Sequence, residues 1–318
     1  MTANMKIVKL FYPLLFILMV NISSADDSVF SVLAVNGPVF MQSGEGSEWK
    51  NLKAGESLNN DMKVRLDGDA YLGLVHKSGY TMEIKETGIY DVNDLNKNFT
   101  GDENKLAKKL SGYVIHEIQE ARDVLNSDEY QLFMDGSAGV ERDIDGRIVL
   151  LGPKMENLIL PEGDVPLKYF NWDDTGIETD YDFYIMDGDG EIVYEKQTDK
   201  KNVAVNLEAV DLQKGVKYSW NVKPAGEVEF DAASKHFRVL SDQVANEIKN
   251  GYSILVKNME DKSSPLNMLL LAKFYENNKL WSDASKVYQR ILMKYPEVEA
   301  FRNLYEYFNY RMSGNAVN

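Results

Sequence analysis

Short runs of alternating apolar and polar residues, separated by turns that contain glycine, fill the stretch from Val32 to Val92. A period of two is typical of a β-strand with one buried face. The Ser78-Gly79 pair between two such runs favours a hairpin turn. We therefore predict a small all-β domain over residues 29–94, a sandwich or barrel with Trp49 in its core. Exposure of Trp49 at a binding face is the alternative. Alternation is clearest at Met62, Val64, Leu66, Ala70, Leu72 and Leu74.

The order of these motifs resembles the FecR-like domain of bacterial cell-envelope proteins. The resemblance rests on the strand ending Val35-Asn36-Gly37-Pro38-Val39, on Trp49 with Leu52, on Gly55 with Leu58, and on the strand pair around Ser78-Gly79. The run Lys63 to Leu66 departs from the family, which commonly carries Thr after this strand. The resemblance implies a binding or scaffold module. Family regulators carry an anti-sigma segment before this domain, and here the domain directly follows an export signal. A FecR-type envelope signalling component is therefore the less favoured alternative.

The first 25 residues have the three parts of a secretory signal peptide. Lys6 and Lys9 are basic, Leu10 to Val20 is apolar, and Ser23-Ser24-Ala25 supplies small residues before Asp26. The apolar run is shorter than the ~20 residues that span a membrane. We predict cleavage near Asp26, with an uncleaved anchor as the alternative, and no transmembrane segment after cleavage.

Localisation is predicted to be periplasmic or in the cell envelope. The chain has no cysteine, so we expect neither a lipoprotein nor disulfide bonds.

Acidic residues outnumber basic ones, 50 to 35, which gives a net charge of −15. Removal of residues 1–25 takes away Lys6 and Lys9, and −15 − 2 leaves −17. This charge repels phosphate backbones and anionic lipid surfaces, so no nucleic-acid partner is expected. Solubility is the simplest reason for such a charge.

A helix and a second group of strands follow the first domain. Apolar residues recur at helical spacing over residues 102–127, which predicts a linking helix that packs on a neighbouring domain. Residues 138–239 contain short strands about ten residues apart. The Phe170-Asn171-Trp172 strand and the ending from Leu212 to Val222 resemble immunoglobulin-like and fibronectin III-like domains. This resemblance implies a β-sandwich with Trp172 and Trp220 on facing sheets.

The last region, residues 241–312, is predicted to be a helical bundle. Its middle helix pair resembles one tetratricopeptide unit, through Ala272, Tyr275, Ala284, Tyr288 and Pro296, and departs from it at Met268 and Ile291. The resemblance implies a partner-binding groove on the first helix of the pair, on the face away from Ala272. A bundle that only caps the sandwich is the alternative. The candidate lining residues are Asn267, Lys273 and Phe274.

Enzyme motifs are not found, and His76, His116 and His236 lie in three different regions. Asp187-Gly188-Asp189-Gly190 resembles the start of a calcium loop, but the twelfth position is Thr198 and a hairpin turn is favoured. We predict a multidomain β plus α protein without cofactor or metal. Its expected function is that of a non-enzymatic scaffold or adaptor for envelope proteins. The alternatives are a module that binds glycan or peptidoglycan, with Tyr71, Tyr80 and Tyr90 as candidates, and a hydrolase.

Overall fold

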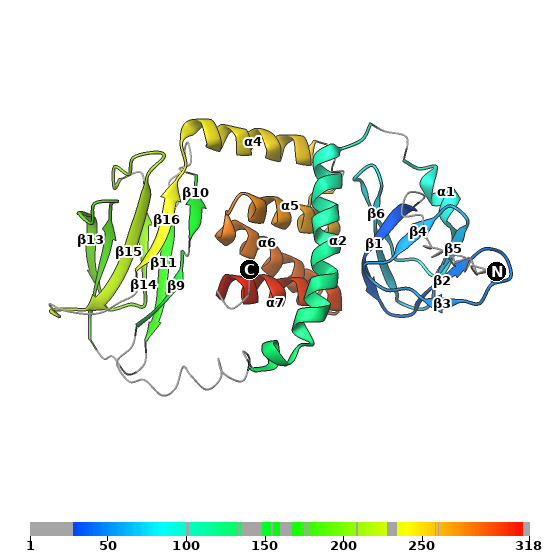
Figure 1. Ribbon diagram of the computed structural model, residues 1–318, viewed down its shortest axis with the longest axis horizontal. Coiled ribbons are helices and arrows are strands. Elements are labelled where there is room, and N and C mark those ends of the chain that lie inside the picture. The colour runs from blue at the N-terminus through cyan, green and yellow to red at the C-terminus, as the bar shows by residue number, and fades with distance from the viewer. Residues whose placement is uncertain are drawn as a thin grey trace, which may run out of the picture.

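The computed structural model describes residues 28–99, 102–132, 134, 148–153, 155–159, 167–174, 176, 179–207, 209–227, 234–257, 259 and 261–313. The predicted signal peptide, residues 1–25, lies outside the described residues. The described chain is a multidomain β plus α protein, as predicted. Sheets form its two ends and a layer of helices lies between them (Figure 1). No helix of the described part has both the length and the apolar composition needed to cross a membrane.

The N-terminal β region consists of two antiparallel four-stranded sheets that share one core. Their strand orders are β4-β1-β6-β7 and β3-β2-β5-β8. The alternating residues point inward as predicted, and Val32, Val64, Leu66, Leu72 and Leu74 are fully buried. A short helix, α1 (Val92–Asn96), closes the region. The strands are β1 (Ser28–Asn36), β2 (Val39–Ser43), β3 (Lys50–Asn51), β4 (Ser57–Asn59), β5 (Met62–Leu66), β6 (Tyr71–His76), β7 (Thr81–Ile84) and β8 (Gly88–Asp91).

Trp49 does not lie in this core, so that prediction is wrong. Its ring packs on the outer face of the second sheet, 4.9 Å from the guanidinium carbon of Arg65. The Phe40 ring also contacts this guanidinium, 4.5 Å from the same carbon. A guanidinium over two rings gains cation–π attraction without leaving water completely. Trp49 is therefore held at the surface by a charged neighbour.

A second β region, called the sheet pair below, encloses a core of aromatic residues. A five-stranded sheet, β10-β16-β15-β12-β13, faces a three-stranded sheet, β14-β11-β9. Trp172 on β11 and Trp220 on β15 are buried in the same core from facing sheets, as predicted. Phe170 lies edge-on to Trp220 at 5.3 Å. The strands are β9 (Ile148–Gly152), β10 (Glu156–Leu158), β11 (Leu167–Asp174), β12 (Tyr181–Met186), β13 (Ile192–Thr198), β14 (Asn202–Asn206), β15 (Lys217–Pro224) and β16 (Lys235–Val239).

The helical layer draws on two stretches of the chain that the sheet pair separates. The first stretch supplies α2 (Lys105–Leu125), and the second supplies α4 (Asp242–Val256), α5 (Pro265–Asn277), α6 (Trp281–Lys294) and α7 (Glu299–Ser313). α2 packs against α5 and α7 through Leu110, Val114 and Ile118. The sequence predicts α2 as a linking helix; in the structure it is a member of the layer. Figure 1 shows it running along the whole layer.

α5 is the centre of this layer. It carries the apolar run Leu269-Leu270-Leu271-Ala272, and it is buried on every side. A helix that is apolar all round needs neighbours all round. The N-terminal β region supplies one of them: a Cβ atom on Gly73 of β6 would lie 2.7 Å from Leu266 Cδ2. The absence of a side chain at Gly73 lets β6 approach α5 closely.

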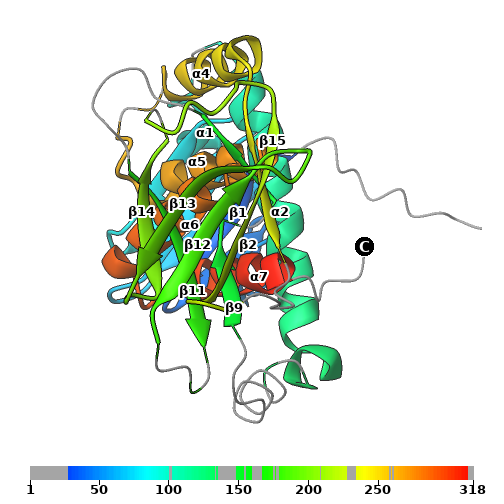
Figure 2. The ribbon, with the colours of Figure 1, turned by 90° about the vertical axis from the view of Figure 1, so that its left-hand side faces the viewer.

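The sheet pair is fixed to the helical layer through the start of α6. Glu156 of β10 accepts hydrogen bonds from the Ser282 backbone N (2.8 Å) and from Ser282 Oγ (2.9 Å). Lys168 Nζ lies 2.9 Å from the same carboxylate. A carboxylate at a helix N-terminus is favoured by the helix dipole. Figure 2, viewed from the sheet-pair end, shows the strands lying in front of α5 and α6.

Because the helical layer is built from two stretches of the chain, cutting the chain between them should not take the layer apart. A protease recognition sequence inserted after Gly136 allows cleavage between α2 and the sheet pair. We expect the two fragments to co-elute in size-exclusion chromatography at micromolar concentration, because α2 remains packed on α5 and α7. They should separate only in denaturant. Fragments that separate under native conditions would show that α2 does not belong to the layer in solution.

Candidate functional site

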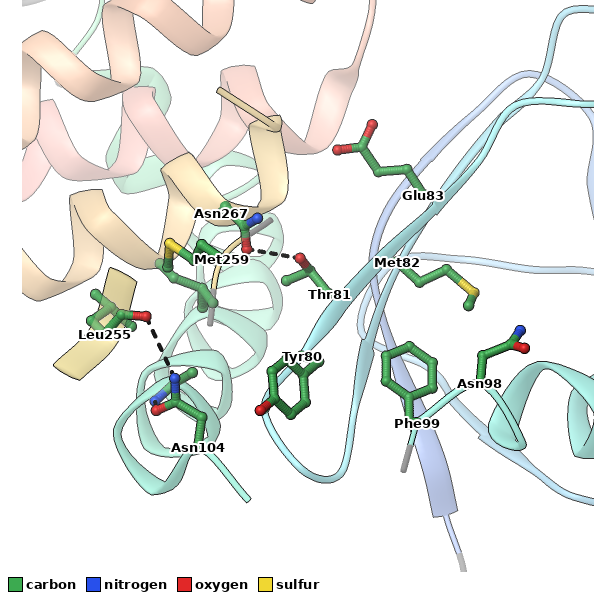
Figure 3. A pocket seen from close by; sticks show the side chains of 13 residues that line it. Tyr80, Thr81, Met82, Glu83, Asn98, Phe99, Asn104, Leu255, Met259 and Asn267 are labelled. Atoms are coloured by element: carbon green, nitrogen blue, oxygen red, sulfur yellow. Dashed lines mark hydrogen bonds between the residues drawn. The ribbon is translucent and has the colours of Figure 1, made fainter. Parts of the chain in front are cut away.

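A cavity of about 520 Å³ lies where the N-terminal β region meets the helical layer. We call it the joint cavity. Strand β7 and its preceding turn form one wall, and the ends of α2, α4 and α5 form the other (Figure 3). Its lining residues are Gly79, Tyr80, Thr81, Met82, Glu83, Asn98, Phe99, Asn104, Ala107, Leu255, Met259, Asn267 and Leu270.

The turn between β6 and β7 forms one end of the joint cavity and rests on the start of α2. Gly79 has φ +93°, a conformation that glycine adopts without strain. A Cβ atom there would lie 2.6 Å from the Lys108 backbone N and 2.7 Å from the Asn104 carbonyl O. Asn104 caps α2, because its Oδ1 accepts from the Ala107 backbone N at 3.0 Å. Only glycine lets the turn come this close to the capped helix end.

The helical wall of the joint cavity is tied to β7 by side chains. Thr81 Oγ1 donates to Asn267 Oδ1 at 2.8 Å, and Asn267 Nδ2 donates to the Asp261 carbonyl O at 2.8 Å. Glu83 accepts from Ser264 Oγ and pairs with Lys85 at 2.8 Å. The polar side chains of this wall therefore already have partners, and the one carboxylate among the described lining residues is neutralised.

Phe99 forms the other side of the joint cavity and is supported by a buried histidine. His76 stacks on Phe99 with ring centroids 4.5 Å apart, and its Nε2 lies 2.9 Å from Asn96 Oδ1. Burial lowers the pKa of His76, although the Asn96 hydrogen bond opposes this. The stacked ring serves to position Phe99. Amides, hydroxyls, methionines and two aromatic rings suit an uncharged ligand better than a proton-transfer reaction.

The three predicted partner-binding residues do not line one groove. Asn267 lies in the joint cavity, whereas Phe274 borders a second cavity of about 310 Å³ between α2, α4 and α5. Lys273 points into the centre of the helical layer and is 6% exposed. The expected open groove on α5 is therefore wrong, because Asn267 and Phe274 are buried as well. Whether these residues contact a partner stays a prediction.

Lys273 belongs to a buried charge cluster that joins three helices. The cluster pairs two carboxylates with two cations: Glu117 of α2, Lys273 and Glu276 of α5, and Arg311 of α7. Arg311 Nη2 lies 2.6 Å from Glu276 Oε2 and 3.0 Å from Glu117 Oε1. Lys273 Nζ contacts Glu117 and lies 3.5 Å from Glu276. Tyr288 of α6 donates to Glu276 Oε1 at 2.6 Å.

Burial dominates the titration of two groups here, the Glu117 carboxyl and the Tyr288 hydroxyl. It raises the pKa of the Glu117 carboxyl, and Glu276 adds to the effect, while Arg311 and Lys273 oppose it. Burial also raises the pKa of Tyr288 well above its usual value. The four charges sum to zero and satisfy one another inside the layer. Such a cluster holds the helices together rather than carrying out a reaction.

The predicted glycan-binding tyrosines are not gathered on one face either. Tyr71 is buried against Phe301 of α7, and Tyr90 donates to the Glu86 carbonyl O at 2.8 Å. Tyr80 alone borders the joint cavity, where its hydroxyl donates to the Asp102 carbonyl O at 3.0 Å. Of the three predicted glycan-binding tyrosines only Tyr80 remains a candidate, because the other two rings pack within the molecule.

The remaining residues that the sequence offers as catalytic or metal-binding candidates lie far from one another. His116 is exposed on α2, and His236 lies on β16, so the three histidines stay separate. In the part of the chain that the structure describes, no three His, Cys, Asp or Glu residues meet at metal-binding distance. Asp187 Oδ1 accepts from the backbone N of Asp189 (3.0 Å) and of Glu191 (2.9 Å), which confirms the predicted turn.

Sequence reasoning misses most of the joint cavity. Phe99, Asn104 and Met259 lie in or beside loops, where residue patterns carry little information about contacts. Asn104 gives one usable signal, since an Asn directly before an apolar helical stripe predicts a helix N-cap. That signal locates the end of α2 but not the turn packed on it.

Substitution of Lys273 by Glu tests the charge cluster. Three carboxylates would then surround Arg311, and we expect a loss of about 3–5 kcal/mol in the free energy of unfolding. Urea denaturation followed by circular dichroism measures the change. Lys286→Glu is the matched control, because that side chain is 66% exposed on α6 and surface changes shift stability by about 0.5 kcal/mol. Equal midpoints for the two variants would place Lys273 at the surface, as the groove prediction requires.

No family model and no curated protein matches the chain. Its function therefore has to be argued from its own residues.

Proposed function

We propose that this chain is an exported, non-enzymatic bacterial envelope protein that acts as an adaptor for partner proteins. The observation that carries the proposal is the joint cavity. It lies between two parts of the molecule, and Thr81 and Asn267 in its wall are already engaged in hydrogen bonds. A wall of this kind binds by shape and neutral contacts, and it offers little for acid–base or nucleophilic chemistry.

The proposed identities of the parts support an adaptor. We assign the N-terminal β region to the FecR-like domains, on its eight short strands and its Gly turns. We assign the sheet pair to the immunoglobulin-like or fibronectin III-like sandwiches, on its facing Trp172 and Trp220. α5 and α6 form the tetratricopeptide-like unit, with Ala272 and Ala284 both fully buried. Domains of these three kinds commonly serve binding rather than catalysis.

The glycan-binding alternative has one specific observation in its favour. The outer face of the second sheet carries the stack of Phe40, Arg65 and Trp49, and Ile89 pairs with Arg65 in the next strand and is 62% exposed. Aromatic rings at a surface can stack on sugar rings. This face lies on the N-terminal β region and is separate from the joint cavity, so the two functions can be tested independently.

Site-specific photocrosslinking tests the adaptor proposal. Asn98 is exposed at the joint cavity, and a photoreactive phenylalanine analogue there should crosslink to a defined protein in envelope preparations. The same analogue at Asp189, on the exposed β12–β13 turn, is the matched control. A protein adduct from position 98 that is missing from position 189 supports the proposal. Identical adducts, or none at either position, contradict it.

Sedimentation with purified peptidoglycan tests the alternative. If the outer aromatic face binds glycan, the chain should sediment with the polymer, and Trp49→Ala should release it. Tyr113→Ala removes an exposed ring from α2 and should change nothing. A chain that stays in the supernatant rules out the glycan function without affecting the adaptor proposal.

A further inference from the structure

The wall that β7 gives to the joint cavity is the edge of a sheet. β7 is the last strand in the order β4-β1-β6-β7. Residues 79–83 all line the cavity, although successive side chains of a strand point to opposite faces of its sheet. A cavity that touches consecutive residues must therefore reach around the strand edge, where the backbone is open. Figure 3 shows Thr81 and Glu83 on the α5 side, and Met82 with Phe99 on the other.

Two residues of β7 present their backbone groups to the cavity. In an antiparallel ladder, pairs that exchange hydrogen bonds alternate with pairs that do not. The His76 backbone N donates to the Tyr80 carbonyl O at 2.7 Å. This pair is therefore a hydrogen-bonded one, and every second pair along β6 and β7 is hydrogen-bonded as well. Met82 and Ile84, two and four residues later, therefore bond to β6. Thr81 and Glu83 then direct their N–H and C=O groups outward.

Those outward groups have no protein partner within the described ranges. β7 pairs with β6 alone, and no backbone hydrogen bond from Thr81 or Glu83 reaches another described element. An unpaired strand edge is a template for a further strand, and natural proteins usually cover or charge such edges. Here the edge opens onto a cavity instead of bulk solvent.

We propose that the joint cavity binds an extended peptide segment of a partner protein, which adds as a fifth strand to β7. The proposal rests on the adaptor function and names how the partner is held. Strand addition uses main-chain hydrogen bonds for affinity and alternate side-chain positions for specificity. The outward N–H and C=O groups of Thr81 and Glu83 supply up to four such bonds.

The residues on the two sides of the β7 edge indicate which side chains the bound peptide should carry. On one side, Phe99 and Met82 offer an aromatic ring and a flexible thioether, which suit an apolar side chain. On the other, Thr81 and Asn267 present a hydroxyl and an amide, which suit a small polar one. β7 is four residues long, so it pairs with about 13 Å of extended chain at ~3.3 Å per residue. The segment should alternate apolar and small polar residues over four or five positions.

A phage-displayed library of random dodecapeptides, selected on the full chain, supplies the probe. Glu83→Pro removes the outward N–H, and an edge strand tolerates proline. Glu83→Ala is the matched control, because it loses the same side-chain contacts but keeps the N–H. We expect selected peptides to alternate as described. They should bind Glu83→Ala within about threefold of the wild type and Glu83→Pro at least tenfold more weakly.

Hydrogen exchange gives a second readout on the same complex. A bound selected peptide should slow exchange in the segment 79–84 of the wild type, with both variants shown to be folded by circular dichroism. Equal affinity for the proline and alanine variants, no slowing at 79–84, or a library that enriches nothing would each overturn strand addition. A crosslink from position 98 that persists in any of these cases would leave the adaptor function standing with a different binding mode.

Discussion

The burial of α5 on every side is the constraint on which the rest of the structure depends. Most of this helix is apolar, but Lys273 and Glu276 place two charges inside the layer. A buried charge without a partner costs several kcal/mol. Glu117 and Arg311 neutralise that pair, and they come from α2 and α7. Both helices must therefore close on α5 in one register, and we regard the cluster as the device that fixes this register.

The position of α5 also creates the joint cavity. Its first turn meets the N-terminal β region at two points: Leu266 over Gly73, and Asn267 at Thr81. The Gly79 turn meets α2 on the other side. β7 lies between these contacts and is supported at both ends, so its outer edge spans a space that neither helix fills. The cavity results from how the two regions meet and belongs to neither of them alone.

Residue patterns predict elements well here and contacts poorly. The alternation of apolar and polar residues identifies the strands of the first β region. Trp172 and Trp220 identify the core of the second. Trp49 fails because residue type alone favours burial, whereas the nearby Arg65 holds the ring at the surface. The predicted groove on α5 is wrong because the face away from Ala272 is buried too: Leu269, Leu270 and Leu271 surround the helix with apolar surface. Periodicity finds the apolar stripe of α2 but does not say which elements cover it. The helices that do so lie far along the chain.

Because Glu117 and Lys273 are 156 positions apart, the helical layer has a particular order of assembly during synthesis. At ~5–20 residues per second, the partners of α2 are made roughly 8–30 s after α2 itself. The stripe of Leu110, Val114 and Ile118 must stay out of wrong contacts for that time, and the sheet pair is made in the interval. Leu33 and Ala34 of β1 already exist by then and belong to the same core as this stripe. The N-terminal β region is thus the partner of α2 that is made first.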